Sequence, residues 1–350
     1  MNTDYRYILL VLVTLIILEL LLLSLLIFRK ARMNKRRSRE DKNSKAILPL
    51  IINYLYDEDD DYFNDQMKIE YDFKVIERIL SNLTITTRDE TLDIKIKQLA
   101  EFFLSTHYKK ALKSGTWSQR MNTLYSISNF KLDSFVPLLK DRFNNLHKWE
   151  EEKQQVARVL ATFGDLSIIN EVFNSNKSYP KFYRDILSRY PISAEEELYA
   201  LYKISDNPFF ITAYIGRIGH VGNSDKAWIL ESALANQNAA IRMQALKSIG
   251  HIFHMEHPEL LKPFFTSEIW QERLLAVQLV NKLQLNGYKP QLKKLLGDSE
   301  WWIRNSTAET ILEVEGSESL AEYANSHDDK YARDMAGQWI SLEKKVALIG

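Results

Sequence analysis

The C-terminal part of the chain repeats one pattern every 29 to 31 residues, with an arginine at the same place in each copy. The marking arginines are Arg242, Arg273, Arg304 and Arg333. Each lies in a segment of helical periodicity that follows a polar residue suited to capping a helix; these residues are Asn236, Ser267, Asp298 and Asp328. A period of this length is typical of stacked helical repeats. Because such arrays usually bind other macromolecules through one long surface and do no chemistry, the repeat predicts a scaffold.

Apolar residues also recur at helical spacing nearer the N-terminus. Residues 67–83 and 88–112 both place them at three- and four-residue steps, which gives each helix one buried stripe. No segment shows sustained alternation of apolar and polar residues between turn signals, so we expect no strands. Irregularly spaced copies of the repeat follow at 118–130, 154–165, 181–190 and 208–219. The predicted fold class is therefore all-α, with an α-solenoid of helical hairpins after the N-terminal segment.

Two segments, 236–250 and 298–312, show the repeat pattern best. Each has a capping amide or acid, an apolar residue followed by arginine, and an alanine three or four residues later. This pattern resembles the HEAT repeat, in particular its short bacterial form. The resemblance is clear over about residues 205–342 and thin over 67–204. It implies two antiparallel helices per repeat, with the shorter partner helices at 257–267, 288–296 and 318–326. It says little about function, because the family includes scaffolds, transport receptors, chromophore lyases and a class of DNA glycosylase.

The marking arginines have a structural interpretation. In a helical repeat, an arginine at a fixed position usually bonds to a carboxylate or helix end of the next repeat, because a partly buried guanidinium needs its donors satisfied. Three arginines follow a tryptophan by three residues: Trp117 with Arg120, Trp270 with Arg273, and Trp301 with Arg304. Each pair shares one helix face, close enough for a cation over a ring. These six residues are candidate partner-binding residues, as an aromatic and cationic ladder for a peptide or nucleic acid; packing between repeats is the simpler interpretation.

The first 45 residues predict where such a scaffold lies. Residues 7–28 form a run of 22 in which only Thr14, Glu19 and Ser24 are polar, which is enough helix to cross roughly 30 Å of hydrocarbon. Residues 29–45 then carry nine Lys or Arg against two acids. The positive-inside rule predicts a single-pass protein of the cell membrane, with the N-terminus outside and the C-terminal domain in the cytoplasm. A cleaved signal peptide is the alternative, but the main charge cluster lies on the wrong side of the apolar run for that.

This N-terminal region contains two candidate contact sites. A lone carboxyl such as Glu19 near the bilayer centre costs on the order of 2.5 kcal/mol or more, so it either contacts another helix or is a defect that a strongly apolar helix tolerates. Basic residues just inside a membrane attract anionic lipid head groups; the candidates are Arg29, Lys30, Arg32, Lys35, Arg36, Arg37 and Arg39. The expected organisation is a tail and transmembrane helix (1–28), a basic juxtamembrane and acidic linker (29–66), diverged helical repeats (67–204) and HEAT-like repeats (205–350).

Several kinds of chemistry are disfavoured by the sequence. The chain has no cysteine, which removes disulfides, thiolate nucleophiles and thiolate zinc sites. Phosphate-binding, nucleophile-elbow and HExxH motifs are absent. A cluster of imidazoles is of the type that binds zinc or copper, but glycine and proline flank it and predict a helix corner where the ligands diverge; its members are His251, His254 and His257. We expect no enzyme activity, no cofactor and no metal.

A membrane-tethered cytoplasmic scaffold or adaptor explains both halves of the chain, because tethering raises effective concentration without any new contact. The expected partners are a protein at the membrane and anionic lipid head groups. The resemblance to bacterial HEAT proteins suggests a membrane enzyme, such as a glycosyltransferase of envelope polysaccharide synthesis. Nucleic acid is not expected, since the formal net charge is zero. A small-molecule substrate is not expected either, since the catalytic motifs named above are absent. Two alternatives stay open: a HEAT-like enzyme of the lyase or glycosylase type, and a nucleic-acid or anionic-lipid binder that acts through the basic tract.

Overall fold

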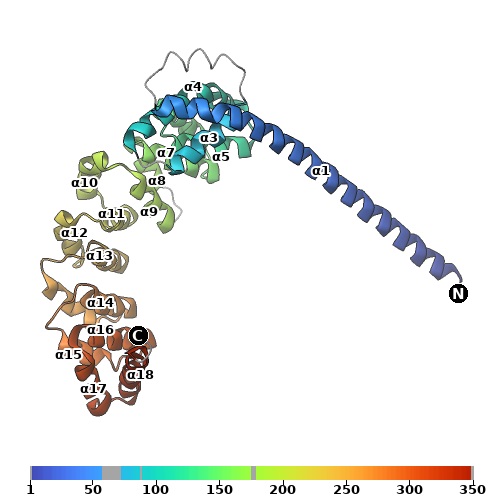
Figure 1. The fold of residues 1–350 in the computed structure, drawn as a ribbon. Helices are drawn as coiled ribbons and strands as arrows, with labels where there is room; N and C mark the ends of the chain where they lie inside the picture. Colours follow the sequence, from blue (N-terminus) through green and yellow to red (C-terminus); the bar gives the residue numbers. More distant parts are fainter. Residues whose placement is uncertain (1, 57–71, 87–88, 175–178, 348–350) are drawn as a thin grey trace. The chain divides into compact units, whose positions relative to one another are not determined.

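The computed structural model describes residues 2–56, 72–86, 89–174 and 179–347 (Figure 1). All regular secondary structure in these ranges is helical, as the sequence predicts. The chain divides into two compact units, Met1–Val159 and Leu160–Gly350. The sequence-based boundary at residue 204 lies inside the second unit.

The first unit consists of one long helix and a series of shorter ones. They are α1 (Asn2–Tyr56), α3 (Phe73–Thr86), α4 (Glu90–Ser114), α5 (Trp117–Asn129), the 3₁₀-helix η1 (Asp133–Phe135), α6 (Val136–Asn145) and α7 (Glu151–Thr162), which contains the division point. Side chains set the helix starts: Asp89 accepts a hydrogen bond from the Thr91 N–H at 2.8 Å, and Thr116 forms a capping box with Gln119 at the start of α5. The predicted helix at 67–83 begins at Phe73, and residues 67–71 lie outside the described ranges.

Helix α1 is unbroken across the predicted transmembrane segment, the basic tract and residues 46–56. Its last turns are buried in the first unit through Ile47, Ile51 and Leu55, which places them against α3 and α4. The Lys95 ammonium caps this end by donating hydrogen bonds to the carbonyls of Tyr54 and Leu55, at 3.3 and 3.2 Å. The sequence treats residues 29–66 as a linker, whereas the structure makes 29–56 part of the same helix as the apolar run.

The second unit stacks successive long helices, each in contact with the next (Figure 1). They are α9 (Pro180–Arg189), α11 (Pro208–Val221), α13 (Ala239–Ile252), α14 (Trp270–Lys282), α16 (Trp301–Glu315) and α18 (Lys330–Ala347). Shorter helices alternate with them: α8 (Ile169–Asn174), α10 (Glu195–Ile204), α12 (Ala227–Ala233), η5 (Pro258–Thr266), α15 (Lys289–Leu295) and α17 (Ser317–Ser326). This all-helical arrangement is consistent with the predicted solenoid.

The four predicted capping residues are not N-caps. The N-caps of α13, α14 and α16 are Asn238, Ile269 and Glu300. The predicted side chains lie two residues earlier and accept the N–H of the N-cap residue: Asn236 from Asn238 at 2.8 Å, Ser267 from Ile269 at 3.1 Å and Asp298 from Glu300 at 2.9 Å. In the fourth repeat this place belongs to His327, whose Nδ1 accepts from the Asp329 N–H at 3.0 Å, and not to Asp328. The side chains therefore order the turn that leads into each helix.

One predicted partner helix has a different form from the others. Residues 258–266 form the 3₁₀-helix η5, with Pro258 at its start and Pro263 inside it. A proline has no N–H to donate and its ring clashes with the preceding turn of an α-helix, which explains the looser winding here. The other two predicted partners are the α-helices α15 and α17.

Helices α11 and α13 approach each other closely at Gly219. A Cβ atom on this glycine would lie 2.8 Å from the Oγ and Cα atoms of Ser248 on α13. The Ser248 hydroxyl also donates a hydrogen bond to the carbonyl of Ile215 at 2.9 Å. The contact between the two helices therefore requires a residue without a side chain at this position.

Candidate interaction surface

Each marking arginine first binds the turn in front of its own helix. One terminal nitrogen donates to the carbonyl six residues earlier in the chain, and the contacts are Arg242 to Asn236 at 2.9 Å, Arg273 to Ser267 at 2.7 Å, Arg304 to Asp298 at 2.7 Å and Arg333 to His327 at 2.5 Å. The same nitrogen also reaches the next carbonyl in all four cases. The repeat period in the sequence is thus the period of this turn contact.

Two of these arginines also reach into the next repeat. Arg242 donates to the buried carboxylate of Glu272 on α14, at 2.8 Å from Nε and 2.7 Å from Nη2. Arg273 donates two hydrogen bonds to Asp298, ahead of α16, at 2.7 and 2.9 Å. Burial alone would raise the pKa of Asp298, but the hydrogen bonds from Arg273 and the Glu300 N–H outweigh it and hold that pKa below its usual value. The interpretation of the marking arginines as stacking residues is confirmed at these two positions.

Arg304 ends this series of ion pairs. Its guanidinium lies over the ring of Tyr331 on α18, 5.6 Å from the ring centroid. Its Nε is buried and has no hydrogen-bond partner among the described residues. At this position the contact from α16 to α18 is therefore a cation over a ring and not an ion pair. The two helices are also joined by a hydrogen bond from Trp339 Nε1 to Asn305 at 3.1 Å.

The spacing of the three tryptophan–arginine pairs predicts a guanidinium over each tryptophan ring, but the arginines make other contacts. The guanidinium groups of Arg120 and Arg273 bind carboxylates, and the ring beneath Arg304 is that of Tyr331. Trp117 and Trp301 stay 49 and 46% exposed, and Trp270 is partly buried. Packing between repeats thus accounts for only part of the tryptophan surface.

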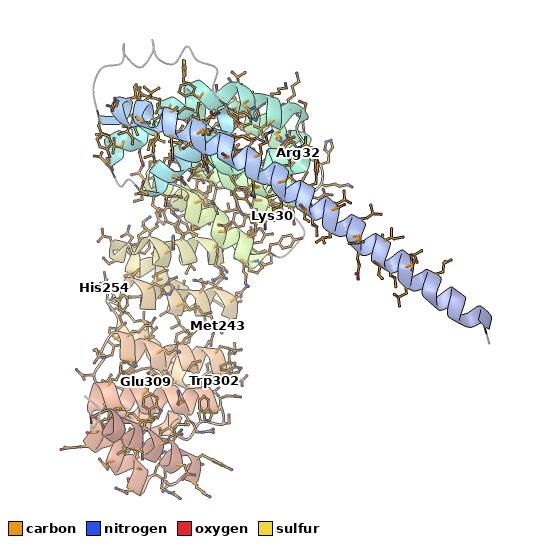
Figure 2. All side chains as sticks on the ribbon, turned by 45° about the vertical axis from the view of Figure 1, so that its right-hand side comes forward. Lys30, Arg32, Met243, His254, Trp302 and Glu309 are labelled. Carbon is orange, nitrogen blue, oxygen red and sulfur yellow. The ribbon has the colours of Figure 1, made fainter. Side chains whose placement is uncertain are left out.

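Aromatic rings gather along one edge of the second unit, which we call the aromatic edge: the exposed Trp301, Trp302 and Tyr331, and the partly buried Trp270. Trp270 and Trp301 begin α14 and α16, and Tyr331 is the second residue of α18. The contacts of Arg273 with Asp298 and of Arg304 with Tyr331 bring these helix starts together. Trp301 and Trp302 pack edge to face at 4.8 Å, and Trp302 and Tyr331 are 60 and 66% exposed. Figure 2 shows Trp302 and Met243 toward one side of the stack and His254 toward the other.

A buried ion network, which sequence reasoning missed, joins α10 and α11. Arg217 is 2% exposed and donates from Nε to Glu195 at 2.8 Å. Its terminal nitrogens donate to the carbonyls at the end of α9: Leu187 at 2.7 Å, Tyr190 at 2.8 Å and Pro191 at 3.2 Å. Glu195 also accepts from Lys226 at 2.6 Å and Tyr214 at 2.9 Å. Burial favours a higher pKa for Glu195, but these donors prevail and lower the pKa. The only sequence signal is an arginine within an otherwise apolar helical segment.

Two arginines meet one buried carboxylate in the first unit. Arg120 on α5 donates to Glu152 at 2.8 and 2.7 Å, and Arg142 on α6 binds the same carboxylate. Both also reach carbonyls that end α4: Arg142 that of Leu112 at 2.7 Å and Arg120 that of Gly115 at 2.8 Å. Burial opposes ionisation of Glu152, yet the two guanidinium groups lower its pKa. Arg120 therefore has the same stacking role as Arg242; neither its partner Glu152 nor the second arginine on that carboxylate, Arg142, was predicted.

The histidine cluster lies at a corner, as predicted from its flanking residues. Helix α13 ends at Ile252, Phe253 has a left-handed backbone with φ of 52°, and η5 begins at Pro258. The three histidine side chains are all exposed. Among the described residues, no group of three or more His, Cys, Asp or Glu side chains is placed to hold a metal ion.

The N-terminal candidates lie on the exposed part of α1. Glu19 is exposed, as are the apolar residues around it. Arg29, Lys30, Arg32 and Lys35 are exposed as well, and Figure 2 shows Lys30 and Arg32 on the helix. The side chains of Arg36, Arg37 and Arg39 lie outside the described ones.

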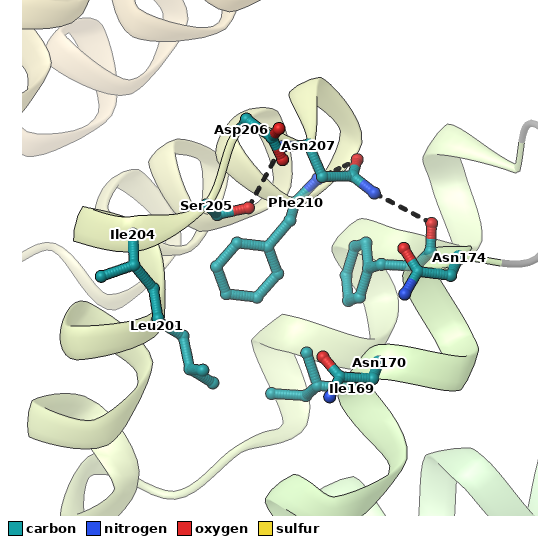
Figure 3. Close-up of a pocket in the computed structure, with 10 residues that line it drawn as sticks. Ile169, Asn170, Asn174, Leu201, Ile204, Ser205, Asp206, Asn207 and Phe210 are labelled. Carbon is teal, nitrogen blue, oxygen red and sulfur yellow. Dashed lines mark hydrogen bonds between the residues drawn. The ribbon is translucent and has the colours of Figure 1, made fainter.

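A pocket of about 250 Å³ lies between α8, α10 and α11 (Figure 3). Ile169, Leu201 and Phe210 supply much of its apolar lining. Of its polar side chains, Asn207 has a structural role: it caps α11 by accepting from the N–H groups of Phe209 and Phe210, and it donates to the carbonyl of Phe173 at 3.0 Å. The remaining polar lining consists of Asn170, Asn174, Ser205 and Asp206.

Comparison with known proteins names no family for the chain. No family model matches it, and no curated protein matches it. Similar solved structures include an engineered protein at 12% identity, covering 75% of this chain and 77% of that one with a TM-score of 0.31. The complex of CpcE and CpcF of phycocyanin lyase from Nostoc is 14% identical, covers 65 and 84%, and has a TM-score of 0.27. A second engineered protein is 14% identical, covers 77 and 96%, and has a TM-score of 0.27. Likenesses at these scores carry no argument about function.

Proposed function

We propose that the chain is a single-pass membrane protein that holds a helical-repeat scaffold of HEAT-like type at the cytoplasmic face, where the scaffold binds a protein partner. The observation that carries the proposal is the division of α1 into two parts. One part exposes a long apolar surface, and the other is buried through Ile47, Ile51 and Leu55.

The exposed part of α1 has the properties of a membrane span. It has a mean hydropathy of 2.5 over 18 residues, and none of that window is buried in the protein. In water, such a contiguous apolar surface would promote aggregation, whereas hydrocarbon solvates it. The span ends at the exposed basic residues Arg29, Lys30, Arg32 and Lys35, which favours a cytoplasmic body and contact with anionic lipid head groups.

The aromatic edge is the surface that we assign to the protein partner. Tryptophan and tyrosine are the residues most often found at the energetic centres of protein interfaces. Here they are held by helix starts that the arginines fix in place, so little conformational entropy is lost on binding. A membrane enzyme is one class of partner that this placement suits.

Topology is tested with single cysteines at Asn2 and Gly350, since the native chain has none. In intact cells an impermeant thiol reagent should label position 2 and spare position 350 until the membrane is opened. Labelling of position 350 from outside would overturn the topology.

Partner binding is tested by crosslinking in intact membranes and identification of what is recovered. The double variant Trp301→Ala, Trp302→Ala should lose the recovered protein. Trp228→Ala, which removes an exposed tryptophan of α12 (51% exposed) in the same unit, should retain it. Recovery of lipid and the chain alone from the wild type would refute the scaffold function.

A further inference from the structure

Among the described side chains of the α1 span, one polar group is not satisfied by its own helix. The Thr14 hydroxyl donates to the carbonyl of Leu10 and the Ser24 hydroxyl to that of Leu21, both at 2.9 Å. Such back-bonding makes hydroxyls tolerable in hydrocarbon. Glu19 lies between them, exposed, with no comparable bond in the described part of the helix. A carboxyl at this depth gains by finding a partner in another helix.

The residues around Glu19 form a uniform apolar stripe. Leu12, Glu19 and Leu26 are seven residues apart, and Leu15 and Leu22 fall between them at the same spacing, so all five lie on one face in a heptad pattern. All of them are exposed. At 100° per residue, Thr14 and Ser24 fall on the opposite face. Glu19, whose carboxyl needs a partner, is therefore the middle residue of this heptad face, and a heptad face is the kind that packs against another helix.

We propose that this face binds a second copy of the chain, so that two α1 helices form a parallel dimer in the membrane with their Glu19 carboxyls in contact. A protonated carboxyl both donates and accepts a hydrogen bond, so Glu19 is its own complement. Two copies inserted in the same direction have their Glu19 residues at the same depth in the membrane. A two-fold axis between them then pairs the same face of each α1 helix. Hydrogen bonds between polar side chains of neighbouring helices are a recognised source of association in hydrocarbon, where the hydrophobic effect gives no driving force.

The dimer rests on the proposed membrane insertion, and single-cysteine crosslinking separates the two. Cysteines are introduced one at a time into the cysteine-free full chain at Leu15, Leu22 and Leu26 on the proposed interface, and at Ile17 and Leu21 on the opposite side. Membranes are oxidised and dimers are scored on non-reducing gels. The interface positions should form several-fold more disulfide-linked dimer than the other two. Equal yields around the helix, or linkage to a protein of different mass, would refute the second-copy assignment.

Substitution of Glu19 tests the contact itself. In the Leu22→Cys background, Glu19→Leu should weaken dimerisation by about 5- to 30-fold, the range expected for one bond between helices in a membrane. Glu19→Gln should keep most of it, because an amide also donates and accepts. The matched control Ser24→Leu removes a polar side chain from the other face and should change nothing. An undiminished dimer in Glu19→Leu contradicts the proposal.

Alkaline carbonate extraction of the same membranes distinguishes the two kinds of failure. If the protein stays in the membrane but does not crosslink, the dimer proposal is refuted and the proposed membrane insertion is supported. If the protein is released to the supernatant, both proposals are refuted.

Discussion

Two of the marking arginines, Arg242 and Arg273, divide their donors between two tasks. One side of the guanidinium holds the turn in front of its own helix, and the other reaches the following repeat in Arg242 and Arg273. A guanidinium can do both because its five donors diverge in one plane. The sequence revealed these residues because they recur at a fixed period. It did not reveal Arg217 or Glu152, whose partners come from positions that no period marks.

Loss of Arg217 should be costly for folding. Arg217→Met would leave Glu195 with one cation fewer and three carbonyls without their donor, in a site with little water. Removing one partner of a buried ion pair costs about 3–5 kcal/mol. Arg189→Met, which breaks an i,i+4 pair with Asp185 on the surface, should cost about 0.5 kcal/mol. Denaturant unfolding of the full chain in detergent compares the two variants; equal losses would contradict the assigned role of Arg217.

Acid should weaken the repeats through the same ion pairs. Glu152, Glu195 and Asp298 have lowered pKa values in the folded chain. For a carboxyl whose folded-state pKa is below its unfolded value, the stabilisation is complete above the unfolded pKa and is lost as the pH falls through the folded pKa. The unfolded values are close to 4.5 for Glu and 3.8 for Asp. The melting temperature should therefore drop below about pH 4.5.

The variant Glu195→Gln identifies the contribution of one group to this acid effect. It should lower the melting temperature at pH 7 and flatten its decline between about pH 5 and pH 3. A decline as steep as that of the wild type would show that Glu195 does not contribute.

At the scale of elements, helix starts and crossings depend on details that periodicity does not contain. Period and polarity located α13, α14 and α16, yet the predicted caps are two residues early because their side chains order the turn and not the first helical N–H groups. Pro263 lies within the expected pattern for a partner helix, and only the structure shows that this segment winds as a 3₁₀-helix. Local propensity thus predicts that a helix exists, while its ends and its winding depend on the neighbours.

The close contact of α11 and α13 at Gly219 should not tolerate even the methyl side chain of alanine. Gly219→Ala would place a Cβ atom 2.8 Å from Ser248 and force the helices apart, which typically costs about 1–3 kcal/mol. Gly337→Ala, where a Cβ would meet nothing within 4 Å, is the control. It should be neutral or stabilise by up to about 1 kcal/mol, because alanine favours helix more than glycine does. Thermal unfolding of both variants measures the difference, and a harmless Gly219→Ala would show that the crossing can relax.

At the scale of the whole chain, membrane residence is the property that the sequence predicts most directly, since length and hydropathy suffice to mark a span. The unbroken run of α1 into residues 46–56 was not predicted, because a charged tract between two apolar segments looks like a linker. The structure shows Arg78 within 3.6 Å of both Glu40 and Asp41, and Lys95 at the end of α1. These contacts hold the charged tract and the last turns as helix.

Charges placed in the span should move the protein out of the membrane. Ile16→Arg combined with Leu20→Arg costs about 2.5–3.5 kcal/mol per arginine at the helix centre. We expect this variant in the supernatant after alkaline extraction. Ser38→Arg adds a charge to an exposed position beyond the span and should leave the protein in the pellet. Retention of the double variant would contradict insertion of this segment.

The continuity of α1 makes it a rotational linkage as well as the tether proposed above. A helix turns by about 100° and rises by about 1.5 Å with each residue, so the span and the buried end near Ile51 are locked in phase. One alanine added between Lys30 and Arg32 would turn the first unit by about 100° about the helix axis while moving it by only about 1.5 Å. Seven added alanines would raise it by about 10 Å and nearly restore its azimuth. If α1 spans a membrane as proposed, the number of residues between the span and Ile51 sets the direction in which the first unit faces.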